Sequence, residues 1–575
     1  MLRAVLLTAA AWLVTGAAQV ALALLDARSG AHAVEAVRPP GDGGDLTVPD
    51  AAEHLDRARR SFAAARRRSG GVLAAPVRAV PVVGRQVRSF AALAGSAQEL
   101  TGIAAAAAQE AGDLLGPRRP APERRATQLR ELAGLASRTD DALARVAIER
   151  PRGVLAPLAE RSAALQRELG QARAALARAE RAAATVADFL AGPRRYLLLA
   201  ANNAEMRAGS GMFLSAGTLS TADGTLTLSS MVPTGELLLD DEGVPLERDV
   251  ARHWSWMRPG REWRNLATSP RFDAVAPMAA EMWARRTGEQ VDGVLALDVA
   301  ALQALLAATG PVEVGDRVVS EETVVGYLLE GQYTGLDFSP GQQAARREQL
   351  GQISAAVLRA VQDGSYDAAR LAARLAFAAR GRHVLAWSTD PREQAGWEAA
   401  GISGKMAPNS VALSVLNRGG NKLDPHLAVQ GQLAFLVTHD STEVVLRATL
   451  RNRAPEGLGV YAAGPHPDSG ARAGEYLGIL VVNVPGDAHD IVVDGVPSLL
   501  ASGPDGPTSM VAARVLLGRG EERTVTVRFR LPSPRGSVLV TPSARVPPIV
   551  WRDGTAEWRD DAARLVTWRP GAQAA

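Results

Sequence analysis

Polar and charged side chains gather directly after the first buried-strand pattern of the sequence. The apolar run Tyr196–Ala201 (YLLLAA) predicts a short strand that is buried on both faces. Four side chains that can bind a polar ligand follow it, namely Asn202, Asn203, Glu205 and Arg207. Functional groups at the end of a central strand of an α/β sheet commonly line a crevice, so we expect a binding site there.

This segment has the chemistry of a phosphate site. The planar fork of Arg207 can give a phosphate two charge-assisted hydrogen bonds, and Asn203 can add a polar contact. Glu205, just before that arginine, can hold it or a hard cation such as Mg²⁺. Gly209 and Gly211 would let backbone N–H groups approach an anion. The alternative is that Glu205 and Arg207 pair with each other while the asparagines cap a turn.

A second polar cluster, Arg346, Arg347 and Gln349, lies near the start of a predicted helix over 344–362. These side chains would face the same phosphate if the helix packs beside the first strand. On the alternative interpretation they form a solvated helix face. The glycine-containing segment Arg418–Lys422 is a further candidate for anion binding, or a plain loop.

Several function classes are excluded by composition and motif. The chain has no cysteine, which excludes disulfides, thiol catalysis and thiolate metal sites. Its eight histidines show no metal-ligand spacing, and a formal net charge of only +3 gives no basic field for nucleic acid. The motifs of serine hydrolases, P-loop nucleotide triphosphatases and dinucleotide-binding proteins are absent from the sequence.

The amino terminus carries an apolar segment long enough for a membrane. Val5–Leu25 is a run of 21 uncharged residues, about 31 Å long as a helix. The flanking charges favour the amino terminus inside and the rest outside the cytoplasm. A cleavable signal peptide with a site near Ala21–Ala23 is the alternative. We therefore expect residues 1–28 to be an anchor or signal segment, and the protein to be single-pass and extracytoplasmic.

Residues 29–192 are predicted to form a linker, over 29–46, and a helical stalk. One helix of the stalk has apolar and small residues at alternating spacings of four and three, which is a heptad seam. Its members are Leu165, Leu169, Ala172, Leu176, Ala179, Ala183, Val186 and Leu190. A homo-oligomer that associates through the stalk is one expectation; a simple spacer is the other.

The remainder predicts a multidomain α+β protein. Strand and helix patterns alternate over 193–424, which favours an α/β/α sandwich. Apolar residues alternate with polar ones over 425–547, as in Val444–Leu450 and Val525–Leu531, and this is typical of a β-sandwich. Residues 548–575 are taken as a tail.

Several of these segments resemble a bacterial domain-of-unknown-function family, number four-zero-one-two. The resemblance covers about 80–545, rests on the order of the motifs, and implies no activity. It is carried by Tyr196–Arg207, Asp292–Asp298, Thr309–Val312, Asn417–Asp424 and the upstream Val80–Gly84.

The order of elements is more distantly similar to the LytR-CpsA-Psr envelope proteins, which transfer glycan polymers from polyprenyl pyrophosphate carriers to peptidoglycan. An acidic-x-Arg pair follows the first strand in that family, as Glu205-Met-Arg207 does here, and an Arg-Gln helix resembles Arg346–Gln349. This resemblance implies an α/β/α sandwich with a long lipid-binding groove. Where that family carries Pro-Arg-Asp, this chain has Pro233-Thr-Gly235, so two expected pyrophosphate and metal contacts are missing.

Two functions are therefore expected. In the first, a membrane-anchored envelope protein binds a polyprenyl-phosphate-linked glycan through Asn203, Arg207, Arg346, Arg347 and Gln349. If it also transfers the glycan, Glu205 and Arg207 are the catalytic residues and Glu205 holds Mg²⁺. In the second, the protein is a non-catalytic scaffold or adhesion protein that holds the cell wall or a protein partner.

Overall fold

A computed structural model describes residues 2–36, 48–116, 121–240, 242–337, 339–364, 366–465, 469–532 and 536–568. The chain forms two compact units, which meet in sequence at Asp188 and Phe189. We call them the helical unit and the C-terminal unit. Two short stretches cross this division, since 119–123 belongs to the C-terminal unit and 368–370 to the helical unit.

The helical unit is built from long helices that pack through small side chains. Its helices are α1 (Leu2–Glu35), α2 (Val48–Gly70), α3 (Ala75–Ala79), α4 (Pro81–Leu115), α5 (Pro122–Ala144) and α6 (Ala156–Ala191). Ala23, Ala65 and Ala94 form a buried cluster where α1, α2 and α4 run side by side. Alanine permits this close approach because its side chain ends at Cβ. The predicted helical stalk is confirmed, but α1 continues to Glu35, so no linker begins at residue 29; residues 37–47 lie outside the described residues.

The apolar run Val5–Leu25 lies within α1. The side chains of residues 5–11 are not among those described. In the part of the chain that the structure describes, no helix combines the length and the apolarity needed to cross a bilayer. Asp26 of α1 accepts a hydrogen bond from Arg68 of α2 at 2.8 Å, which ties the two helices together.

The heptad seam lies on α6, as predicted. Its leucines at 165, 169 and 176 are half-buried, and Ala172 and Ala179 are exposed. The residues that α6 does bury are Ser162, Thr185 and Ala187. The seam is thus not the buried face of α6, and association through it stays a prediction.

The C-terminal unit begins with a mixed sheet in the strand order β3-β2-β1-β5-β8, with β4 beside β2. The strands are β1 (Arg194–Met206), β2 (Gly211–Ala222), β3 (Thr225–Leu228), β4 (Val232–Pro233), β5 (Gly293–Leu297) and β8 (Val384–Ser388). β1 is parallel to β5 and antiparallel to β2. The sequence Ala222-Asp223-Gly224 predicts a turn between β2 and β3, and the structure has it, with positive φ at Asp223 (49°) and Gly224 (77°).

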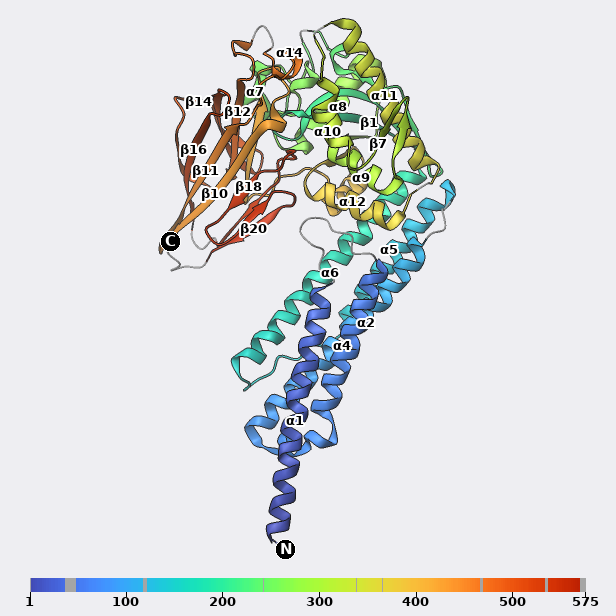
Figure 1. The fold of residues 1–575 in the computed structure, drawn as a ribbon, viewed down its shortest axis with the longest axis vertical. Helices are drawn as coiled ribbons and strands as arrows, with labels where there is room; N and C mark the ends of the chain where they lie inside the picture. The colour runs from blue at the N-terminus through green and yellow to red at the C-terminus, as the bar shows by residue number, and fades with distance from the viewer. Residues whose placement is uncertain are drawn as a thin grey trace. The chain divides into compact units, whose positions relative to one another are not determined.

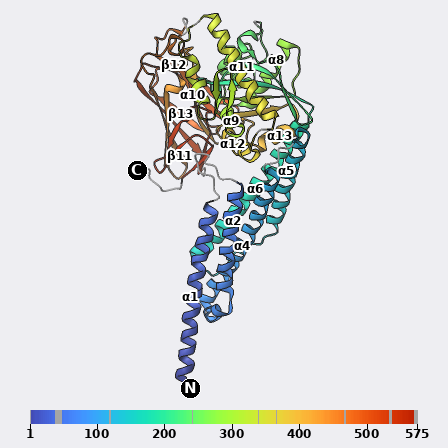
Figure 2. The same ribbon diagram turned by 45° about the vertical axis from the view of Figure 1, so that its right-hand side comes forward.

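Helices cover this sheet and build a smaller subdomain beside it (Figure 2). They are α7 (Arg248–Trp254), α8 (Phe272–Thr287), α9 (Val299–Thr309), α10 (Val324–Leu329), α11 (Pro340–Gln362), α12 (Ala368–Arg380) and α13 (Pro391–Ala399). Val275 and Met282 of α8 share a core with Leu197 of β1 and Val294 of β5. A separate core joins α9, α10 and α11 to the hairpin of β6 (Val312–Val314) and β7 (Arg317–Val319).

Two further six-stranded sheets complete the C-terminal unit. One contains β13 (His489–Asp494), β16 (Glu522–Pro532), β11 (Ser441–Asn452), β10 (Leu427–Val437), β18 (Val550–Arg552) and β19 (Glu557–Arg559). The other contains β14 (Leu499–Asp505), β15 (Thr508–Leu517), β12 (Tyr476–Pro485), β9 (Ser410–Asn417), β17 (Ser537–Val540) and β20 (Arg564–Thr567). A short helix, α14 (Val460–Ala463), precedes β12.

These two sheets share one hydrophobic core. The predicted alternation of apolar and polar residues explains it, because it puts the apolar side chains of a strand on one face of the sheet. Val444 faces Phe529 across β11 and β16, and Leu446 faces Val527, so the predicted apolar faces lie opposite each other in register. Two predicted boundaries are wrong. β9 precedes residue 425 yet pairs with β12 of the C-terminal sheets, and the expected tail supplies β18, β19 and β20. Those strands are three or four residues long, too short for alternation to indicate them.

Replacing Gly293 with alanine should destabilise the central sheet by about 1–3 kcal/mol. An added Cβ would lie 2.3 Å from the carbonyl oxygen of Trp387 and 2.5 Å from the ring of Tyr196. Gly326→Ala is the matched control, because nothing lies within 4 Å of its Cβ position and alanine favours the helix α10. Urea unfolding followed by tryptophan fluorescence measures both variants. Equal stability of the two variants would show that β1 and β5 do not pack as described.

Candidate functional site

The sequence predicts a crevice at the end of β1, which it places at Ala201. In the structure β1 ends at Met206 instead. β1 continues to Met206, with its pairing to β2 interrupted between Asn202 and Met206. A Cβ on Gly211 would lie 2.4 Å from the backbone of Asn202, so only glycine lets the two strands close here. The prediction that the strand stops at Ala201 is wrong, because a local irregularity of this kind has no apolar periodicity. Asn202, Asn203 and Glu205 are strand residues.

Arg207 is buried and uses its N–H groups on main-chain carbonyls. Its Nε donates to the carbonyl of Arg264 at 2.7 Å, and its Nη1 donates to those of Met206 at 3.0 Å and Asn417 at 2.8 Å. Burial lowers the pKa of Arg207 to about 10, so it remains a cation at neutral pH. Its Nη2 lies 3.4 Å from Asn265 Oδ1, so all three guanidinium nitrogens have an internal partner. In this arrangement Arg207 joins the β1–β2 turn to the end of β9.

Glu205 has a buried cation as its partner. Its carboxylate lies 2.7 Å from Lys422 Nζ, and only 6% of each side chain is exposed. Lys422 also lies 4.8 Å from the ring centroid of Tyr461, a cation–π distance. Among the described residues, Glu205 is thus paired with Lys422. The alternative interpretation, in which it pairs with Arg207, is not what the structure has.

The residues around Glu205 do not fit Mg²⁺. Hard cations require several oxygen ligands, and this carboxylate already contacts an ammonium group. Within the described parts of the chain, no three histidine, aspartate or glutamate side chains are arranged to hold a metal ion. No catalytic step through a metal at Glu205 follows from this geometry.

Asn203 is fully buried and bridges three segments. Its Nδ2 donates to Asp298 Oδ2 and to the carbonyl of Ala544, both at 2.9 Å, and its Oδ1 accepts from the backbone N–H of Val299 at 3.3 Å. Asp298 in turn caps α9 by accepting from Ala300 and Ala301. Among the described residues, Asn203 therefore has internal partners, at a junction that includes the start of α9.

Asp424 is the centre of this buried network, and the sequence did not single it out. It accepts hydrogen bonds from the backbone N–H of Met206 at 3.0 Å, Asn417 Nδ2 at 2.9 Å, the hydroxyl of Tyr476 at 2.9 Å and Arg545 Nη1 at 2.8 Å. Both Asp424 and Arg545 are almost fully buried. The end of β1 is thus a packed joint between the central sheet and the C-terminal sheets. We call Glu205, Arg207, Asn417, Lys422, Asp424 and Arg545 the buried joint.

The other predicted cluster lies on α11, and two of its three residues line one cavity. Arg346 Nη1 donates to Gln332 Oε1 at 3.1 Å, and its guanidinium lies 5.7 Å from the ring centroid of Tyr333. Gln349 Oε1 accepts a hydrogen bond from the hydroxyl of Tyr327 at 2.6 Å. Arg347 is exposed and does not line this cavity. Arg346 and Lys422 of the buried joint each lie 5.7 Å from the ring centroid of Tyr333, whereas Arg207 is held by main-chain carbonyls.

This cavity, which we call the α11 hollow, has a volume of about 950 Å³. Its walls are the β6–β7 hairpin, α10, the short turn Gly331–Tyr333 and the first turns of α11. Its lining side chains include Arg317, Tyr327, Gln332, Arg346, Glu348 and Gln349. Arg317 lies 4.3 Å from the ring centroid of Tyr327. Burial raises the pKa of Tyr327, while Arg317 and Arg346 act against that rise.

One atom of the hollow lacks a partner. Arg346 Nε is buried, yet it makes no hydrogen bond in the described structure. A buried N–H without an acceptor is costly, and because Nε is closed to solvent, a ligand oxygen would reach it only if the Arg346 side chain turned toward the hollow. Arg346 is therefore the best candidate for anion binding in the hollow.

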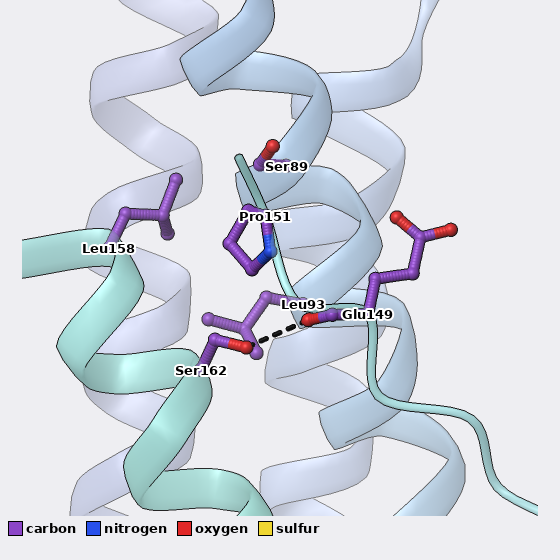
Figure 3. Close-up of a pocket in the computed structure, with 6 residues that line it drawn as sticks. All are labelled: Ser89, Leu93, Glu149, Pro151, Leu158 and Ser162. Carbon is purple, nitrogen blue, oxygen red and sulfur yellow. Dashed lines mark hydrogen bonds between the residues drawn. The ribbon is translucent and has the colours of Figure 1, made fainter. Parts of the chain in front are cut away.

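A second cavity, in the helical unit, is too small for a similar role. Its volume is about 10 Å³, and it is lined by Ser89, Leu93, Glu149, Pro151, Leu158 and Ser162 (Figure 3). Ser162 donates to the carbonyl of Glu149 at 2.8 Å across it. This space suits at most one water molecule.

Comparison with known proteins identifies one part of the chain. Residues 191–333 match the model of a protein family of unknown function, DUF4012. These residues form a DUF4012 domain. No curated protein and no solved structure matches the chain.

The DUF4012 domain supplies part of the α11 hollow and part of the buried joint. It supplies the β6–β7 hairpin, α10 and Gln332 to the α11 hollow, whereas α11 follows the domain. It supplies Glu205 and Arg207 to the buried joint, whereas Lys422 and Asp424 come from beyond it. Two other segments that carried the resemblance, Val80–Gly84 and Asn417–Asp424, lie outside the matched range. Both places are thus completed by residues that follow the DUF4012 domain.

Proposed function

We propose that this protein is a membrane-anchored, extracytoplasmic envelope protein that binds a polyprenyl-phosphate-linked glycan in the α11 hollow. The observation that carries the proposal is the unpartnered Nε of Arg346, at the wall of a large polar cavity. A phosphate oxygen in the hollow would accept a charge-assisted hydrogen bond from the Arg346 guanidinium. The uncharged run Val5–Leu25 supports the anchor and the extracytoplasmic location.

The lining of the hollow favours a sugar with one phosphate over a polyanion. The charges of Arg317 and Arg346 are balanced by Asp316 and Glu348, so there is no excess of positive charge for several phosphates. Glutamine carboxamides supply both donors and acceptors, which match sugar hydroxyl groups. A volume of about 950 Å³ is near the upper end of the usual range for ligand sites and leaves room for more than one sugar ring.

Binding, rather than transfer, is the function proposed. The residues expected to catalyse transfer, Glu205 and Arg207, are held by Lys422 and by main-chain carbonyls. Removing either from its partners would leave a buried charge uncompensated, which is costly. Both are better explained as parts of the buried joint.

A non-catalytic scaffold is the second candidate, and one observation favours it. The heptad seam of α6 carries half-buried leucines and exposed alanines. Such a seam would suit a second copy of the chain. Sedimentation of the detergent-solubilised protein tests this, because Leu169→Glu with Leu176→Glu should shift an oligomer to monomer.

The binding proposal is tested by calorimetry on the full chain in detergent, with a polyprenyl-monophosphate-linked sugar as the probe. Arg346→Ala should weaken binding by roughly 10–100-fold, since a hydrogen bond to a charged group contributes about 1.5–3 kcal/mol. Arg347→Ala is the matched control and should leave affinity unchanged, because Arg347 is exposed and not part of the hollow wall. Binding that survives Arg346→Ala undiminished would refute the proposal.

A further inference from the structure

One tryptophan of the C-terminal unit, Trp256, is exposed to solvent. Trp256 lies in the short turn Ser255–Met257, and 55% of it is exposed. Its Nε1 donates to the carbonyl of His253 at 3.1 Å, which fixes the ring. The neighbouring Trp254 is buried in the core and anchors the same turn. An exposed aromatic ring that is held in one orientation can stack on a ligand with little loss of side-chain entropy.

Polar groups border this ring. The Arg418 guanidinium lies 5.7 Å from the ring centroid of Trp256, and its Nη1 lies 3.4 Å from Asn265 Oδ1. Asn265 Nδ2 donates to the carbonyl of Met257 at 2.9 Å, which ties the carboxamide to the Trp256 turn. We call Trp256, Asn265 and Arg418 the Trp256 platform.

The buried Arg207 makes hydrogen bonds to the main chain beside two residues of this platform. Its guanidinium donates to the carbonyl of Arg264, next to Asn265, and to that of Asn417, next to Arg418. Arg207 thus links the main chain next to Asn265 with the main chain next to Arg418. The segment 418–422, considered above as an anion-binding segment or a plain loop, contributes its arginine to this surface.

We propose that the Trp256 platform binds a neutral sugar ring of a glycan. One face of a pyranose consists of C–H groups that stack on an indole, and its hydroxyl groups would reach the guanidinium and the carboxamide. A cation would be repelled by Arg418. Tryptophan and arginine are also enriched at protein interfaces, so a protein partner is the competing outcome of the test. The inference uses no residue of the α11 hollow and stands whether or not that site binds phosphate.

The test is ¹⁹F NMR of the full chain labelled with 5-fluorotryptophan, titrated with neutral tetrasaccharides of glucose, galactose, mannose and N-acetylglucosamine. The chain has ten tryptophans, and Trp256→Phe assigns the resonance of interest. At least one tetrasaccharide should shift that resonance saturably. Trp256→Ala and Arg418→Ala should each weaken its affinity about tenfold or more, while Trp256→Tyr retains part of it.

Two controls keep the outcomes distinct. Arg264→Ala, which removes an exposed side chain paired with Glu262, should leave sugar affinity unchanged. Arg346→Ala should also leave it unchanged, so loss in that variant alone would move the sugar to the α11 hollow and overturn the platform. The inference also fails if none of the four sugars shifts the Trp256 resonance, or if only a protein partner does.

Discussion

Replacing Asp424 with alanine should lower the free energy of unfolding of the C-terminal unit by about 3–5 kcal/mol. Asp424 is fully buried and accepts four hydrogen bonds, one of them from Arg545, of which 1% is exposed. Removing the carboxylate leaves the Arg545 guanidinium charged and uncompensated in the protein interior. It also removes the acceptors of Met206, Asn417 and Tyr476. Urea unfolding followed by tryptophan fluorescence measures the loss.

An exposed ion pair provides the control for this prediction. Asp494 lies 2.7 Å from Arg528, and about half of each side chain is exposed. Asp494→Ala should change stability by less than about 1 kcal/mol, because water screens such pairs. If the two variants lose equal stability, Asp424 does not occupy the centre of a buried joint.

The second prediction concerns pH and Asp560. Burial raises the pKa of its carboxyl from 3.8 to about 6, although it accepts hydrogen bonds from Ile549 and Ser543. Because the folded state holds this proton more tightly, stability from the group is fully present below pH 3.8 and is lost as pH rises through about 6. The shift corresponds to about 3 kcal/mol. In Asp560→Asn this part of the pH dependence should disappear, so the two stability curves should diverge between about pH 4 and 6.

The same series of urea unfolding curves contains its own control. Burial raises the pKa of Asp553, but hydrogen bonds from Thr555 and Ala556 outweigh it, so the net pKa is lowered from 3.8. Stability from that group is present above pH 3.8 and is lost as pH falls, so Asp553→Asn should leave the slope between pH 4 and 6 unchanged. Parallel curves for the wild type and Asp560→Asn would contradict the burial of Asp560.

His383 adds to the same trend at higher pH. Burial lowers its pKa, but the carboxylate of Asp298 at 2.6 Å outweighs burial, so the pKa is raised above 6.5. Stability from this pair is present below pH 6.5 and is lost as pH rises through the raised pKa.

Elements with a strong local pattern could be predicted from the sequence with accuracy. The sequence patterns predict helices over 272–287 and 368–380 and a strand over 293–297, and α8, α12 and β5 have these bounds. The alternating runs of β11 and β16 also pair with each other in register. By contrast, α10 and the turn Gly331–Tyr333 are too short for a periodic signal. They supply Tyr327, Gly331 and Gln332 to the wall of the α11 hollow, so its shape could not be predicted.

The environment of Arg207 could not be predicted, for a different reason. Its residue type and position suggested phosphate, but its acceptors belong to Arg264 and Asn417, which lie 57 and 210 residues further along the chain. Main-chain carbonyls can belong to any residue type, so nothing in a sequence marks them as partners. Arg346 does stand at a cavity wall, and its binding of phosphate stays a prediction.

Arginine-specific labelling of the full chain, read by mass spectrometry with and without the polyprenyl-monophosphate-linked sugar, tests the assignment of the phosphate to Arg346 most directly. We expect Arg207 to stay unlabelled in both conditions, Arg347 to be labelled in both, and Arg346 to be labelled only without the ligand. Labelling of Arg207 that the ligand suppresses, with Arg346 unaffected, would contradict this account and return the phosphate to the end of β1.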